Sequence, residues 1–127
     1  MHVERLTKLA ELMDAVQADK TKRENFDIGQ WVHNCGSPAC AAGWAMSDPW
    51  FQSQGLKKFT KLGIPTFDGL AHTEALEAFF DLTEDQSNLF HQDGYDADGE
   101  GYITVEPADV ANKIRELLDS TSTKKDA

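Results

Sequence analysis

The 127-residue sequence has no long apolar run, only two cysteines and no recognisable catalytic motif. No segment approaches the ~18 consecutive apolar residues of a membrane-spanning helix. Charged residues interrupt the apolar pattern at the N-terminus, which is not typical of a signal peptide. Nucleotide-binding glycine loops and serine-hydrolase motifs are also missing, and the four histidines are scattered. We therefore expect a cytoplasmic protein that is not an enzyme and has no contact with a membrane.

Basic residues are missing from Leu62 to Asn112, although the chain as a whole contains 12. The same stretch holds more than half of the 22 acidic residues, so the net charge of -10 is concentrated there. DNA binding needs clustered Lys and Arg, and such clusters occur only at 20–23 and 57–61. The sequence therefore predicts no direct binding to DNA. The acidic stretch has three interpretations: a surface for a basic partner, a cation site, or charge that only maintains solubility.

Length, composition and periodicity predict one mostly α domain. A chain of this size buries roughly two thirds of its unfolded surface, so it needs no metal or disulfide to fold. Apolar residues at three- and four-residue spacing predict five or six short helices, and residues 56–67 predict a minor hairpin or an irregular loop. We expect a single helical domain over residues 1–118 and a disordered polar tail over 119–127. The expected core residues are Trp44, Leu76, Phe79, Phe80, Phe90, Ile114 and Leu117.

Two local patterns predict where helices begin. Ser37 followed by Pro38 is typical of an N-cap and a first helical residue, and would make Cys40 the third residue of a helix. Thr83 and Gln86 match the capping-box pattern, which predicts a further short helix directly after them.

Both cysteines lie in the segment from residue 31 to residue 44, WVHNCGSPACAAGW. The first interpretation is packing, because buried free cysteine behaves as a small hydrophobe and Cys40 is followed by alanines. The second is a reactive thiolate at Cys40, favoured by a helix N-terminus and resolved by Cys35 as a disulfide. The third is zinc held by both cysteines and two histidines. The histidines considered for that site are His33 and either His72 or His91.

The same segment resembles a group of small uncharacterised proteins carried by bacteriophages and bacterial chromosomes. The shared pattern is a Trp, then Cys-Gly-x-x-x-Cys-Ala-Ala-Gly-Trp, then the aromatic segment Asp-Pro-Trp-Phe. Further similarity lies at residues 79–83, 89–90 and 107–114, so the likeness covers roughly residues 26–118. The resemblance implies one small fold associated with mobile genetic elements, in which the Cys-Gly segment is a structural hallmark. It implies no activity.

Residues 96–107, DADGEGYITVEP, resemble a calcium-binding EF-hand loop between two expected helices. Asp96, Asp98 and Glu100 occupy its first, third and fifth positions, and Tyr102 would add a backbone carbonyl ligand. The bidentate glutamate of the twelfth position is replaced by Pro107. We therefore expect at most weak calcium binding and no other cofactor, with an Asp/Gly turn before a helix as the alternative.

These observations favour a small acidic interaction protein, encoded by a phage or another mobile element, that acts in the host cytoplasm. Its partner is expected to be a basic protein. The most specific version is inhibition of a host defence nuclease, because carboxylates can occupy a phosphate-binding groove. The alternatives are a weak calcium-binding helix-loop-helix and a thiol or zinc protein that uses Cys35 and Cys40. The expected partner-binding residues are Glu74, Glu77, Asp81, Asp96, Asp98 and Glu100.

Overall fold

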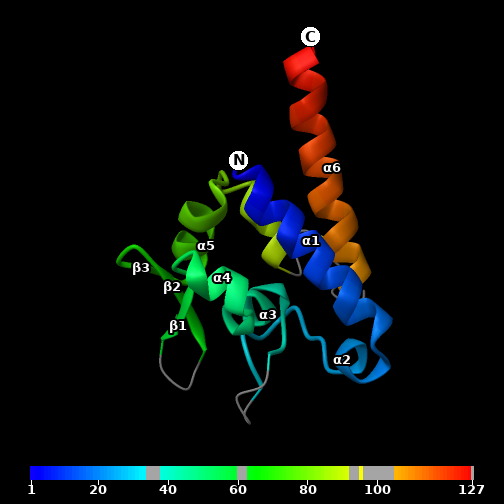
Figure 1. Cartoon of the computed structure of the whole chain (residues 1–127), viewed down its shortest axis with the longest axis vertical. Coiled ribbons are helices and arrows are strands. Elements are labelled where there is room, and N and C mark those ends of the chain that lie inside the picture. Colours follow the sequence, from blue (N-terminus) through cyan, green and yellow to red (C-terminus); the bar gives the residue numbers. More distant parts are fainter. Residues whose placement is uncertain (34–37, 60–62, 92–94, 96–104, 127) are drawn as a thin grey trace.

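The computed structural model of the chain describes residues 1–33, 38–59, 63–91, 95 and 105–126, with side chains through residue 120. These residues form six α-helices, one 3-10 helix and a small antiparallel sheet (Figure 1). The predicted mostly α fold with a minor hairpin is therefore confirmed. The elements are α1 (Val3–Ala18), α2 (Lys20–Glu24), α3 (Ala41–Ser47), α4 (Pro49–Ser53), β1 (Lys57–Phe59), β2 (Ile64–Phe67), β3 (Leu70–Ala71), α5 (His72–Phe80), η1 (Gln86–Phe90) and α6 (Pro107–Asp126).

Helices α1 and α6 form the most extensive helix pair and lie side by side (Figure 1). Gln17 of α1 accepts a hydrogen bond from the Ala108 backbone N–H at 3.0 Å, which caps the start of α6. Helix α6 continues to Asp126, past residue 118, where the sequence predicted a polar tail. No Gly or Pro follows Pro107 to end it. The residues that the pair contributes to the hydrophobic core are Leu6, Leu9, Ala10, Met13, Val16, Val110, Ala111 and Ile114.

Helix α3 packs against α1, α4 and the sheet, and all of its residues except Trp44 and Met46 are small. Alanine and glycine allow neighbouring backbone to approach closely. The closest approach is at Gly43, where a Cβ atom would lie 2.0 Å from the carbonyl oxygen of Trp31. This position therefore accepts only glycine without movement of the neighbouring chain.

The predicted start of this helix is wrong. The N-cap of α3 is Cys40 and its first residue is Ala41, so the helix begins three residues later than the predicted first helical residue, Pro38. Pro38 instead pairs with the segment 27–32 in an isolated antiparallel bridge, and both backbone groups of Ala39 bond to that segment at 3.3 and 2.8 Å. These hydrogen bonds satisfy the backbone in an extended conformation, which removes the need for a helical turn there. Ser37, the predicted N-cap, lies outside the described residues.

The sheet has the order β1-β2-β3 and is antiparallel throughout. The pairing of β1 with β2 is the predicted hairpin, with Lys57 opposite Thr66. The third strand, β3, was not predicted. It pairs with β2 through a two-residue turn at Asp68 and Gly69, whose φ angles are 51° and 81°. Positive φ at both residues is the type I′ geometry that Asp-Gly favours, so this dipeptide was the sequence signal for the second hairpin.

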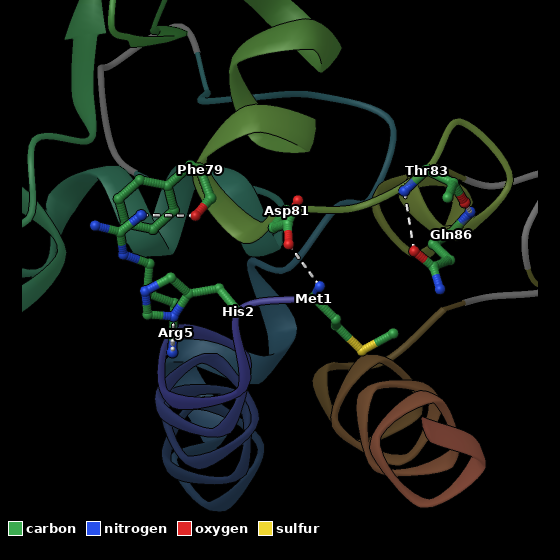
Figure 2. A network of polar contacts seen from close by, with 7 residues as sticks. All are labelled: Met1, His2, Arg5, Phe79, Asp81, Thr83 and Gln86. Carbon is green, nitrogen blue, oxygen red and sulfur yellow. Dashed lines mark hydrogen bonds and ion pairs between the residues drawn. The ribbon is translucent and has the colours of Figure 1, made fainter. Parts of the chain in front are cut away.

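The first residues of the chain close the C-terminal end of α5 (Figure 2). The His2 backbone N–H donates to the Phe80 carbonyl at 2.8 Å, and the Arg5 guanidinium donates to the Phe79 carbonyl at 2.8 Å. These donors satisfy carbonyl groups that have no partner within the helix. Asp81 follows with φ of 54°, and this left-handed conformation ends α5.

The capping box predicted at Thr83 and Gln86 is confirmed (Figure 2). The Thr83 N–H donates to Gln86 Oε1 at 2.9 Å, and the Gln86 N–H donates to Thr83 Oγ1 at 3.2 Å. The helix that follows is the 3-10 helix η1, which packs against α5 and α6. The chain therefore reverses between α5 and η1 and brings the two elements together.

The expected core residues are buried to different degrees. Five of them are at most 1% exposed: Leu76, Phe79, Phe80, Phe90 and Ile114. Trp44 and Leu117 are partly buried and pack against this core. The core predicted from helical spacing is thus correct at its centre and less buried at these two positions.

Candidate functional site

Three glutamates gather in a cleft between α5 and η1. Glu74 and Glu77 lie about one turn apart on the same face of α5, and Glu84 comes just before η1. The cleft has a volume of about 420 Å³, and we call it the acidic cleft. Its other lining residues are Thr73, Ser87, Asn88 and His91.

Hydrogen bonds fix part of the acidic cleft. The Ser87 side chain is buried, and its Oγ lies 2.8 Å from Oε2 of Glu77 and 2.7 Å from the backbone oxygen of Glu84. Its single proton can be donated to only one of these acceptors at a time. A second contact in the lining joins Thr73 Oγ1 and His91 Nε2, which lie 3.2 Å apart. The cleft therefore has a fixed wall at Glu77 and His91.

The negative charge of the cleft is not neutralised within the described part of the chain. No Lys or Arg side chain of that part forms an ion pair with Glu74, Glu77 or Glu84. Glu74 and Glu84 are exposed, whereas Glu77 is half-buried. Carboxylates collected in a concave surface concentrate a negative field there. The cleft is therefore suited to a cationic group from outside the chain.

Asp81, predicted to share a surface with Glu74 and Glu77, does not line this cleft. Its carboxylate binds the N-terminal amine of Met1 at 2.7 Å (Figure 2). The hydrogen bond from this amine, together with its positive charge, lowers the pKa of the Asp81 carboxyl. The structure thus assigns Asp81 to holding the start of the chain.

Glu84 and Ser87 were not predicted as site residues. That they meet α5 in space depends on the direction the chain takes after Phe80, which the sequence does not show. The capping box at Thr83 was the available signal, because it predicts a second helix close behind α5, and the two elements do pack together. His91 was considered only as a zinc ligand, and the structure places it in the acidic cleft.

Several predicted residues lie outside the described residues: Cys35, Asp96, Asp98, Glu100 and Tyr102. Calcium binding by residues 96–107 therefore stays a prediction. In the ranges that the structure does describe, no group of three or more His, Cys, Asp or Glu side chains is arranged to hold a metal ion. His33, considered for zinc, has its Nε2 atom 2.5 Å from the backbone oxygen of Asn25.

Cys40 lies in the core at the start of α3 and is 1% exposed. Its Sγ lies 3.9 Å from the carbonyl oxygen of Trp31. Burial raises the pKa of the Cys40 thiol to about 11, although the backbone N–H groups of Gly43 and Ala42 act in the opposite direction. Loss of hydration therefore outweighs the helix N-terminus, and the structure favours the packing interpretation of this residue.

Alkylation of Cys40 by iodoacetamide is expected to be very slow in the folded protein at pH 7. With a pKa of about 11, only about one thiol in 10⁴ is ionised at that pH, and the sulfur is also inaccessible. Peptide mapping by mass spectrometry, with and without denaturant, measures the protection of Cys40. Equal rates in the two conditions would contradict burial, and Cys40→Ser with unchanged stability would contradict an apolar environment.

No helix in the described ranges has both the length and the apolar character that crossing a membrane requires. Comparison of the chain with protein-family models, with curated proteins and with solved structures finds no significant match in any of the three.

Proposed function

We propose that this chain is a non-enzymatic interaction protein whose acidic cleft binds a basic surface of another protein. The observation that carries the proposal is the set of three glutamates in one cleft, with no Lys or Arg of the described residues paired to them. The absence of Lys and Arg from Leu62 to Asn112 supports it, since no Lys or Arg in this stretch of sequence offsets the negative field. Complementary charge speeds association with a basic partner and excludes acidic ones.

The partner we propose is a nucleic-acid-binding protein, and its most specific form is a host defence nuclease. Such proteins carry Lys and Arg in grooves that bind phosphates, and carboxylates can occupy those grooves. The sequence resemblance to phage-borne proteins implies only an association with mobile genetic elements, and it is the reason we place the partner in the host cytoplasm. The chain itself would not bind DNA, because its net charge is -10.

The double substitution Glu74→Lys with Glu84→Lys tests the proposal. Reversing two charges in the cleft is expected to weaken binding of a labelled Arg-Arg-Gly-Arg-Arg peptide about tenfold at low salt. Fluorescence anisotropy measures this affinity, and a rise in salt should reduce it for the unmodified protein.

The matched control is Glu11→Lys with Glu24→Lys. Both residues are exposed, and the control changes the net charge by the same amount outside the cleft. If the control weakens the peptide as much as the cleft variant does, binding depends on total charge and the cleft is not the site. If neither variant changes the affinity, the acidic stretch serves only solubility.

A further inference from the structure

A second hollow lies beside the acidic cleft and has a different chemistry. It has a volume of about 270 Å³, and its residues are Ile28, Gly29, Gln30, Trp31, Phe90 and His91. Ile28 and Phe90 are buried, and the rings of Trp31 and His91 meet edge to face with centroids 6.5 Å apart. We call this the aromatic hollow. None of its six residues is Asp, Glu, Lys or Arg, so it is suited to an apolar group.

His91 is common to the two sites. It lines both the acidic cleft and the aromatic hollow. The contact of its Nε2 with Thr73 Oγ1 at 3.2 Å holds the ring on the cleft side, and Trp31 contacts it on the hollow side. The apolar hollow and the three glutamates are therefore neighbours, separated by one side chain.

The size of the aromatic hollow indicates what it can hold. Its volume of about 270 Å³ is below the roughly 300–1,000 Å³ typical of pockets for drug-sized molecules and cofactors. One apolar side chain is a better match. The glutamates next to it require that the neighbouring part of the same ligand be positively charged.

Resting on the function proposed above, we infer that the aromatic hollow binds one apolar side chain of the basic partner, next to an Arg or Lys that the acidic cleft holds. The partner segment is then a basic stretch interrupted by an apolar residue. Charge complementarity brings the segment to the cleft, and the apolar anchor supplies specificity. This division agrees with protein interfaces in general, where a few buried anchors carry most of the affinity and charged contacts mainly affect association.

Two labelled peptides separate the contributions of the two sites. Arg-Arg-Gly-Arg-Arg and Arg-Arg-Leu-Arg-Arg differ only in the central residue, and fluorescence anisotropy gives their affinities. The leucine peptide is expected to bind about tenfold more tightly, because one buried apolar side chain provides that difference. The substitution Trp31→Ala should remove this gain and leave the affinity for the glycine peptide unchanged.

A control and a second variant accompany Trp31→Ala. Trp50→Ala removes another half-buried tryptophan that lines neither site and should preserve the gain. Gly29→Leu adds bulk at the hollow and should also remove the gain. A Cβ at Gly29 would contact only Asp27 Oδ1, at 3.3 Å, so this variant is expected to fold even if Trp31→Ala does not.

The outcomes distinguish this inference from the proposed function. Equal affinity for the two peptides, or an equal loss for both in Trp31→Ala and Gly29→Leu, overturns the aromatic hollow as a binding site. The proposed function survives that result if Glu74→Lys with Glu84→Lys still weakens both peptides. If neither peptide binds, or if the glutamate variant binds both normally, the proposed function fails and the inference fails with it.

Discussion

Replacing Phe79 by alanine is expected to lower the free energy of unfolding by about 3–5 kcal/mol. The Phe79 side chain is fully buried, and its ring contacts those of Phe51, Phe67 and Phe80, with centroids 6.0, 5.1 and 4.8 Å away. The guanidinium carbon of Arg5 lies 4.2 Å from the same ring. The substitution therefore leaves a cavity among three aromatic rings and removes the cation–π contact between Arg5 and Phe79.

Urea denaturation of Phe79→Ala and of Phe59→Ala, followed by circular dichroism, measures this effect against a matched control. Phe59 lies on the edge strand β1 and is 58% exposed, so its truncation should change the free energy of unfolding by less than about 0.5 kcal/mol. Similar losses in the two variants would show that Phe79 does not organise the core. Retention of most of the stability in Phe79→Ala would show that the site collapses around the cavity.

Local sequence signals predicted the parts of the fold that depend on a single element. Helical spacing of apolar residues predicted a mostly α fold of short helices because burial of one helix face is a property of the helix itself. The capping box predicted the start of η1 because both of its hydrogen bonds join Thr83 and Gln86, three residues apart. The spacing of apolar residues also predicted Phe79, Phe80 and Phe90 as core residues.

Features decided by contacts between distant segments could not be predicted in this way. Ser37-Pro38 is a good local start for a helix, yet Pro38 pairs with Val32 and Ala39 forms hydrogen bonds with Trp31 and Asp27 instead. Asp81 was grouped with the acids of α5 by its position in the sequence. Its actual partner is the amine of Met1, 80 residues away. Local propensity carries no information about either contact.

The candidate site also depends on contacts that local sequence patterns do not predict. The charge pattern located the acidic stretch but not which carboxylates meet, because that depends on the chain reversal after α5. Glu84 joined Glu74 and Glu77, whereas Asp81 did not. The aromatic hollow has a still weaker signal in the sequence, since Trp31 and His91 are 60 residues apart and come together only in the folded chain.

Replacing Gly43 by alanine is expected to destabilise the protein by at least about 2 kcal/mol, although alanine is the better helix former. Helix propensity alone would favour alanine by about 1 kcal/mol. Against it, the added Cβ would lie 2.0 Å from the Trp31 carbonyl oxygen, and this obstacle is backbone rather than a movable side chain. The same oxygen accepts the Ala39 N–H at 3.3 Å, so moving it away breaks a hydrogen bond as well.

The matched control for Gly43→Ala is Gly29→Ala, in which the new Cβ would meet only a flexible carboxylate oxygen of Asp27, at 3.3 Å. That variant should be nearly neutral or slightly stabilising, because alanine reduces the freedom of the unfolded chain. Thermal denaturation of both variants shows whether the clash with the Trp31 carbonyl or the helix propensity of alanine has the larger effect on stability. If Gly43→Ala is as stable as the unmodified protein, α3 does not lie as close to Trp31 as the structure places it. If it is destabilised as expected, it should also bind the leucine peptide less tightly, since the displaced Trp31 forms one side of the aromatic hollow.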